Sequence, residues 1–205
     1  MKVHTIEQRS DEWHAVRSSK FTASAFYDLM MRKSTLGYKK AVARVVYGRL
    51  NGRCPDEDFQ SADMQNGIDL EPMGLEAYSN DYPGEILDVG FVEMSEWIGG
   101  SPDGLIKIGD GIPGMVELKC PRWNTHIEYF KLKEGQCPQK YFWQIHGLMW
   151  ITGLKWCDFV SYHPELPLVV RRIERDDVSI ANLATRLKEA QIEAESILES
   201  LKSGK

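Results

Sequence analysis

The sequence has no long apolar run and no closely spaced cysteine pair. No stretch approaches the ~18 consecutive apolar residues of a membrane span, and the N-terminal segment "MKVHTIEQRSDEWH" lacks the apolar core of a secretion signal. The cysteines form no C-x-x-C pair, which argues against a zinc ribbon or an iron–sulfur cluster; they are Cys54, Cys120, Cys137 and Cys157. We therefore expect a cytoplasmic protein that contacts no membrane and keeps its cysteines as reduced thiols.

Low-complexity segments, internal repeats and long linkers are also missing, so one domain over residues 1–205 is expected. The composition is that of an ordinary globular protein, with 42% hydrophobic and 27% charged residues. We divide this domain into a basic helical N-terminal part over 1–53, a core over about 54–175 and an amphipathic C-terminal helix over about 177–202.

The charges are unevenly distributed along the chain. Residues 1–53 carry 11 Lys or Arg and 4 Asp or Glu, whereas residues 54–120 carry 2 and 15. A basic part suits the attraction of an anion, and an acidic part concentrates carboxylates. Charge blocks on solvated helices explain the same distribution equally well.

The residue pattern predicts an α/β fold with one central mixed β-sheet flanked by helices. Helical periodicity and cap residues predict helices over 10–19, 22–31, 35–52, 61–82, 125–135 and 138–153, and a C-terminal helix. Thr22 is the expected cap of the second helix, and Gly67 and Pro72 indicate a break in the fourth. Alternation predicts strands over 85–94, 103–108, 114–120, 155–164 and 166–175.

The segment "SPDGLIKIGDGIPGMVELK" combines an aspartate in a tight turn with charged residues on a strand. Glu117 and Lys119 are two residues apart and so share one strand face. If "GDGIPG" closes a hairpin, Asp103 converges with Glu117, and two such carboxylates repel each other unless a cation neutralises them. Mg²⁺ prefers hard oxygen ligands, to which the carbonyl of Leu118 would add. A turn followed by a solvated strand face is the alternative interpretation.

Four motifs in order along the chain resemble one nuclease family. They are "EWHAVRSSKFTAS", "NGIDLEP", the S-P-D-G and E-L-K pair, and "QIHGLMWITG", which together span residues 13 to about 153. They are similar to the motifs of the phage lambda exonuclease family, the YqaJ-type viral recombinases, within the P-D-(D/E)-x-K nuclease superfamily.

The resemblance implies a restriction-endonuclease-like core and a Mg²⁺-dependent exonuclease, with two ions and with Mn²⁺ as a substitute. Such an enzyme digests double-stranded DNA from 5′-phosphorylated ends in the 5′-to-3′ direction and leaves 3′ single-stranded overhangs. The resemblance also implies a ring-shaped homotrimer, a single-strand annealing protein as partner, and a phage or prophage protein in the bacterial host cytoplasm.

By the same resemblance, Asp103 and Glu117 are the metal-binding carboxylates and Glu71 is the helix glutamate that supports the metal site. Lys119 matches the catalytic lysine, and Gln144 matches the helix glutamine near the cleaved phosphate.

A second group matches the residues that receive the DNA end. Arg17, Ser24 and Ser101 resemble the pocket for the terminal 5′-phosphate, and Trp13 resembles an aromatic that contacts the terminal nucleotide. Related nucleases often show Q-x-x-x-Y, and this chain departs from that pattern at Leu148. We expect Tyr141, one helical turn before Gln144, to take the place of that tyrosine.

Two rival functions remain open. The same metal site would serve a structure- or site-specific endonuclease, and a DNA-end-binding subunit without catalysis would keep the basic surface. The second rival is disfavoured by the chemically competent residues at Glu71, Asp103, Glu117 and Lys119. The basic block over residues 33–53 is expected to contact the DNA backbone.

Overall fold

The computed structural model describes residues 1–54 and 61–204. Residues 55–60 lie outside this range. The predicted boundary near residue 54 adjoins them, and the acidic residues Asp56, Glu57 and Asp58 of the middle part belong to them. Within the described ranges, none of the helices combines the length and the apolar composition needed to cross a bilayer.

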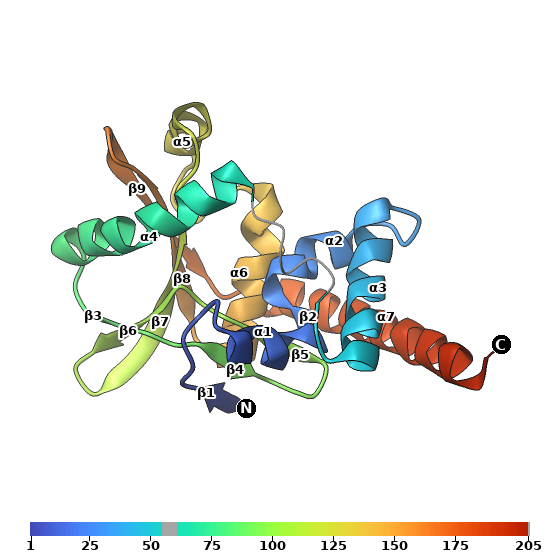
Figure 1. Ribbon diagram of the computed structural model, residues 1–205. Helices are drawn as coiled ribbons and strands as arrows, with labels where there is room; N and C mark the ends of the chain where they lie inside the picture. Colours follow the sequence, from blue (N-terminus) through green and yellow to red (C-terminus); the bar gives the residue numbers. More distant parts are fainter. Residues whose placement is uncertain (55–60, 205) are drawn as a thin grey trace.

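Helices and short strands alternate in the first half of the chain, and a regular sheet follows (Figure 1). The elements are β1 (Lys2–His4), α1 (Asp11–Ser18), β2 (Phe21–Thr22), the 3-10 turn η1 (Ala23–Ala25), α2 (Phe26–Met30), α3 (Leu36–Asn51), α4 (Ala62–Asp81), β3 (Glu85–Leu87), β4 (Phe91–Glu93), β5 (Ile98–Gly100), β6 (Gly104–Ile108), β7 (Gly111–Lys119), α5 (Trp123–Phe130), α6 (Gln139–Thr152), β8 (Trp156–His163), β9 (Leu166–Glu174) and α7 (Asp177–Ser203).

The central sheet has five strands in the order β3-β6-β7-β8-β9, and β7 and β8 are its parallel pair. The predicted mixed sheet flanked by helices is thus confirmed. A second, four-stranded sheet in the order β1-β4-β5-β2 was not predicted. Its strands are two or three residues long, too short to display an alternating pattern.

Helices cover both faces of the central sheet (Figure 1). On one face, Tyr78 of α4 packs with Val116 and Leu118 of β7. On the other face, Met115 of β7 belongs to the main core together with Ile145 of α6. Successive residues of β7 therefore point alternately toward α4 and toward α6.

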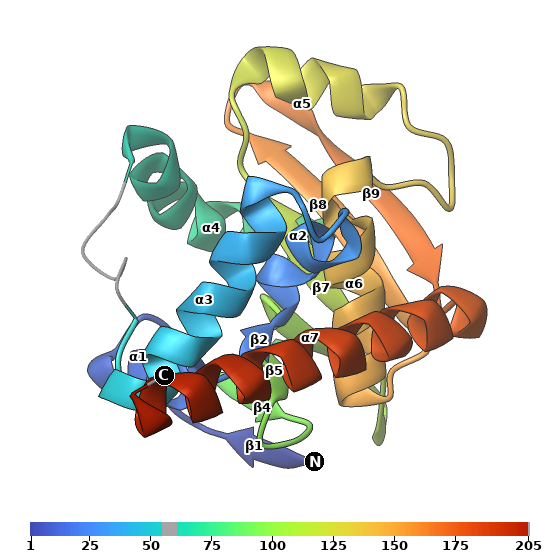
Figure 2. The ribbon, with the colours of Figure 1, turned by 90° about the vertical axis from the view of Figure 1, so that its right-hand side faces the viewer.

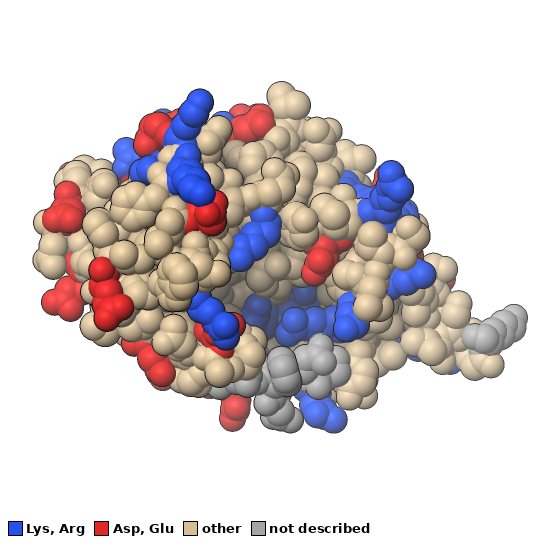
Figure 3. Space-filling model, turned by 90° about the horizontal axis from the view of Figure 1, so that it is seen from above, with Lys and Arg blue, Asp and Glu red and all other residues tan. Residues whose placement is uncertain are grey.

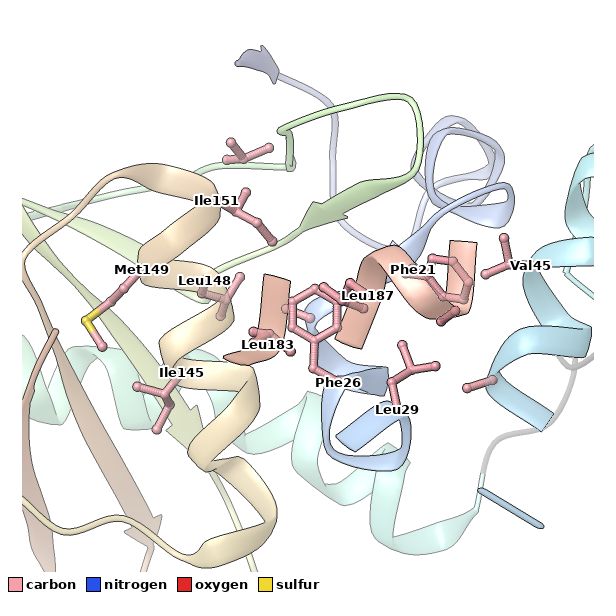
Figure 4. Close-up of a cluster of buried hydrophobic side chains, with 14 of the residues drawn as sticks. Phe21, Phe26, Leu29, Val45, Ile145, Leu148, Met149, Ile151, Leu183 and Leu187 are labelled. Atoms are coloured by element: carbon pink, nitrogen blue, oxygen red, sulfur yellow. The ribbon is translucent and has the colours of Figure 1, made fainter. Parts of the chain in front are cut away.

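The main core joins α6 to the N-terminal helices and to α7 (Figure 4). Phe26 of α2 lies among Leu148 of α6 and Leu183 and Leu187 of α7. A side chain at Gly147 would place its Cβ 2.3 Å from the Phe26 ring, so a glycine is needed where α6 and α2 meet. The N-terminal part is thereby fixed to the sheet-covering helix.

The predicted strand over 85–94 is wrong as a single element. β3 pairs with β6 in the central sheet, whereas β4 pairs with β1 and β5 in the small sheet. The chain changes sheets at Gly90, where a Cβ would lie 2.0 Å from the carbonyl oxygen of Ile6. Close contact with the N-terminal segment therefore divides a stretch whose alternating pattern is typical of one strand.

The predicted break in the fourth helix is also wrong, because α4 continues through Pro72. Proline removes one intrahelical hydrogen bond, but tertiary contacts hold the helix on the C-terminal side of Pro72. Tyr78 donates a hydrogen bond of 2.6 Å to the buried carboxylate of Asp158, and Arg172 donates two bonds of 2.8 Å to the same carboxylate. This network fastens α4 to β8 and β9.

The C-terminal helix is confirmed with nearly the predicted bounds and lies across α3 and α2 (Figure 2). Its buried stripe continues from Ala194 to Leu198, while Ile197 and Leu201 are exposed. The end of α7 extends beyond the body of the molecule (Figure 1), so its last turns have little to pack against.

Two glycine-to-alanine variants test the close contact between α1 and α3. Gly48→Ala would place a Cβ 1.9 Å from the carbonyl oxygen of Ser18, and we expect destabilisation of about 1–3 kcal/mol from overpacking. In the matched control Gly67→Ala, no heavy atom lies within 4 Å of the new Cβ. That variant should gain roughly 0.5–1 kcal/mol from helix propensity. Urea denaturation measures both, and equal stabilities would contradict the proposed contact.

Candidate active site

The β6–β7 hairpin brings Asp103 to the end of β7. Gly104 is paired with Val116 in the antiparallel register, which brings the preceding Asp103 opposite Glu117 and next to Leu118. Asp103 Oδ2 accepts a hydrogen bond of 2.7 Å from the backbone N–H of Leu118, and Lys119 Nζ lies 3.8 Å from the same oxygen. The expected convergence of the turn aspartate with the charged strand is confirmed.

Glu117 is wholly buried, at 0% exposure. Its Oε1 accepts hydrogen bonds from Lys119 Nζ and from Gln144 Nε2 of α6. Its Oε2 has no hydrogen-bond partner in the described part of the chain. The strand face that carries Glu117 and Lys119 is therefore covered by α6, which excludes the solvated strand as the interpretation of this segment.

Burial controls the ionisation of this cluster. Desolvation, and next the charge of Asp103, raises the pKa of Glu117 to about 8. Burial acts to lower the pKa of Lys119, but the charges of Glu117 and Asp103 outweigh it and raise that pKa above its usual value. Lys119 is thus held as an ammonium ion against two carboxyl groups.

Glu71 reaches the same region from α4. Desolvation and the charge of Asp103 raise the pKa of Glu71, and Arg9 donates a hydrogen bond to Glu71 Oε2. Glu71, Asp103 and Arg9 line both a groove of about 570 Å³, which also contains Lys119 and Tyr141, and a groove of about 920 Å³ on their other side. The carboxylates therefore lie where two grooves meet.

The donor set fits a hard divalent cation. Among the described residues, no three His, Cys, Asp or Glu side chains come close enough to form a complete metal centre by themselves. Mg²⁺ does not require one, because it keeps several waters and uses few carboxylates. The unpartnered buried Oε2 of Glu117 is the strongest sign of fit, since a buried carboxylate oxygen without a partner is costly.

Three of the residues expected at the DNA end lie together. The indole Nε1 of Trp13 donates to Ser101 Oγ at 2.8 Å and to the carbonyl oxygen of Gly90 at 3.1 Å. The guanidinium carbon of Arg17 lies 3.7 Å from the centre of a Trp13 ring. Ser101 is two residues before Asp103 in the chain. Trp13 is buried and therefore supports Ser101 and Arg17; its contact with a terminal nucleotide stays a prediction.

Ser24 lies in a 3-10 turn and not in the predicted helix. The predicted helix over 22–31 is a three-residue 3-10 turn followed by the short helix α2, and the side chain of Thr22 makes no cap bond. The Thr22 and Ser24 hydroxyl oxygens lie 3.2 Å apart instead. Thr22 and Arg17 line one small cavity, and Ser24 is not among its lining residues. The part of Ser24 in a 5′-phosphate pocket stays a prediction.

On α6, Tyr141 and Leu148 lie in different surroundings, and the part of Tyr141 in place of the family tyrosine stays a prediction. Leu148 is fully buried in the main core, whereas Tyr141 lies in the groove. Lys119 Nζ is 5.3 Å from the centre of the Tyr141 ring. Sequence reasoning missed Arg9, because a single arginine before a helix cap carries no recognisable signal. Its pairing with Glu71, 62 residues away, is visible only in the fold.

Comparisons with known proteins agree with this geometry. The model of the "YqaJ-like viral recombinase domain" family matches residues 12–155. The chain is 35% identical to an alkaline exonuclease (LHK-Exo) from Laribacter hongkongensis, with a TM-score of 0.84, over 95% of this chain and 97% of the other. The complex of LHK-Exo with dAMP gives a TM-score of 0.85 at the same identity and coverage.

A phage-related exonuclease from Haemophilus somnus 129PT, at 17% identity, shares the fold with a TM-score of 0.67 over 92% of this chain and 99% of the other. The comparison with curated proteins found no match. The family match over most of the chain and the 35% identity over nearly its full length lead to one conclusion. This chain belongs to the YqaJ-like viral recombinase domain family.

Proposed function

We propose that this chain is a divalent-metal-dependent exonuclease that degrades double-stranded DNA from 5′-phosphorylated ends in the 5′-to-3′ direction. That it is a nuclease acting on DNA follows from its family and from its 35% identity to an alkaline exonuclease. The observation that carries the metal-dependent chemistry is the cluster of Glu71, Asp103, Glu117 and Lys119 beside a groove.

The proposed metal ligands are Asp103, Glu117, the carbonyl of Leu118 and Glu71, with Mg²⁺ as the ion, Mn²⁺ as its substitute and two ions in the site. When bound, the metal supplies Lewis-acid polarisation of the phosphodiester and an activated water. Lys119 holds the scissile phosphate and stabilises the charge that develops on it. Gln144 donates a hydrogen bond to Oε1 of Glu117 and so fixes the carboxyl group, which leaves Oε2 as the oxygen that would hold the metal.

The surface around the grooves supports a polyanionic substrate. Seen from above, the molecule is hollowed at its centre, and Lys and Arg side chains gather around the hollow (Figure 3). Lys140 and Arg122 line the groove that contains Lys119. Exposed basic side chains of this kind neutralise backbone phosphates without reading sequence.

The DNA end is assigned to the residues around Arg17. Its guanidinium forms a planar fork suited to a terminal phosphate, and Trp13 and Ser101 link it to the Asp103 turn. We further propose 3′ overhangs as product, a homotrimeric ring, a single-strand annealing protein as partner and a phage or prophage protein in the bacterial cytoplasm. These four points rest on the family resemblance.

Lys119→Met tests the catalytic lysine. We expect the rate of duplex hydrolysis in Mg²⁺ to fall at least ~10²-fold, because a group that stabilises transition-state charge is lost. The matched control is Lys131→Met, whose ammonium pairs with Glu128 on the surface of α5. Circular dichroism checks that both variants are folded. Wild-type activity in the Lys119 variant, or undiminished activity of the parent in EDTA, would exclude the proposed chemistry.

Arg17→Gln tests recognition of the 5′-phosphate. The parent should degrade 5′-phosphorylated linear duplex faster than 5′-hydroxyl duplex, and the variant should lose this preference. A charged hydrogen bond is worth about 1.5–3 kcal/mol, so the ratio of the two rates should fall at least ~10-fold. Lys39→Gln on exposed α3 is the control and should slow both substrates equally. An unchanged ratio in Arg17→Gln would remove Arg17 from the end pocket.

Covalently closed circular duplex separates the exonuclease from an endonuclease of the same fold. The circle offers no 5′ end, so it should remain intact in Mg²⁺ while linear duplex of the same sequence is degraded. Gel electrophoresis gives the result directly. Efficient cutting of the circle would favour the endonuclease, and tight binding of linear DNA without any cleavage would favour a DNA-end-binding subunit.

A further inference from the structure

Arg9 has an unusual backbone conformation beside the active site. Among the described residues it is the one non-glycine residue with a positive φ, 70°. This left-handed conformation costs about 1–3 kcal/mol and persists only where the surrounding structure enforces it. Here the side-chain amide of Gln8, through Nε2, donates to the carbonyl oxygens of Val89 and Pro102, at 2.9 and 3.1 Å. The turn is therefore fixed from outside, and it directs Arg9 to a defined place.

That place is the carboxylate of Glu71. Arg9 Nη2 donates to Glu71 Oε2, although the side chain of Arg9 is 40% exposed and that of Glu71 is 22% exposed. Both residues line both grooves. The guanidinium thus lies at the entrance to the carboxylate cluster, with open space on two sides.

Two cations face three acidic side chains around this contact. Lys119 pairs with Glu117 and lies near Asp103, whereas Arg9 pairs with Glu71. A divalent cation bound to Glu71 Oε2 would repel the guanidinium and would use the same oxygen. Arg9 and a metal ion would therefore compete for Oε2 of Glu71.

We propose that Arg9 is a competing counter-ion that couples metal binding to DNA binding; this inference rests on the proposed function. Arg9 holds Glu71 until a divalent ion replaces it, and the released guanidinium then binds a DNA phosphate in the groove. Because coupling between two sites is reciprocal, DNA that attracts Arg9 also raises the affinity for the metal.

The first test measures metal binding without DNA. In calorimetric titrations with Mg²⁺ alone, Arg9→Gln should bind the ion about 3- to 10-fold more tightly than the parent, because the competitor is gone. Arg9→Lys, which keeps the charge, should stay close to the parent. The matched control is Arg122→Gln: Arg122 lines the same groove but pairs with Asp63, so the Mg²⁺ affinity should not change.

Arg9→Gly separates charge from backbone strain. Glycine accepts a positive φ without strain, so this variant should be more thermostable than Arg9→Gln but should show the same gain in Mg²⁺ affinity. Equal or weaker Mg²⁺ binding in Arg9→Gln would overturn the inference. A gain confined to Arg9→Gly would also overturn it, because the backbone and not the guanidinium would then be responsible.

The second test measures coupling to DNA, with a 5′-phosphorylated duplex protected by phosphorothioate linkages. In Mg²⁺, the slope of log affinity against log salt should be smaller by about one for Arg9→Gln, since one phosphate contact is lost. The duplex should tighten Mg²⁺ binding more in the parent than in this variant. Equal coupling in both proteins would contradict the proposal.

Failure of the two proposals can be distinguished. If the parent binds Mg²⁺ and duplex but cleaves no DNA, the proposed function fails, while the competition at Glu71 is still measured by calorimetry. If the parent is an active exonuclease and Arg9→Gln leaves Mg²⁺ affinity unchanged, only the role of Arg9 fails.

Discussion

The site depends on one interaction, the hydrogen bonding of the buried Glu117 carboxyl group by Lys119 and Gln144. A buried charge is destabilising by several kcal/mol unless it is paired and hydrogen-bonded. Two elements supply its partners at Oε1: β7 supplies Lys119, two residues along the same face, and α6 supplies Gln144. The β6–β7 hairpin brings Asp103 near the same Lys119, whose ammonium group offsets the repulsion between the two acids. The layer order of helix, sheet and helix is therefore also what assembles the charges, and α6 cannot move away from β7 without exposing Glu117.

A second buried carboxylate has a structural role. Asp158 on β8 accepts bonds from Tyr78 of α4 and from Arg172 of β9, and the Arg172 guanidinium lies over the Trp156 ring, 3.6 Å from its centre. Tyr78 is seven residues, about two turns, after Glu71 and so is on the same side of α4. The network fixes the rotation of α4 on the sheet, and this rotation determines whether Glu71 faces Asp103. The buried Asp158 thus positions Glu71 through α4, the helix that carries both Tyr78 and Glu71.

The sequence predicted those parts of the fold and site that depend on local pattern. A two-residue spacing placed Glu117 and Lys119 on one strand face, and capping residues gave the starts of α1 and α4. It did not predict the small sheet or the split of the 85–94 run, because both depend on contact with the N-terminal segment at Gly90. The burial of Glu117 and the Arg9–Glu71 pair likewise depend on residues distant in sequence.

The uneven charge of the chain acquires a more specific meaning in three dimensions. Not every basic residue of the N-terminal part is available to DNA: Lys33 pairs with Glu189, and Arg49 pairs with Glu96 and stacks on Trp97. Besides Lys33, the exposed members of the block are Lys39, Lys40 and Arg53. Long-range attraction of a polyanion depends on the net field and on exposed charge, so only part of the basic block can serve it. The cations nearest the acidic cluster, Arg9 and Lys119, neutralise it and thereby reduce the repulsion between a phosphate and the carboxylates it must approach.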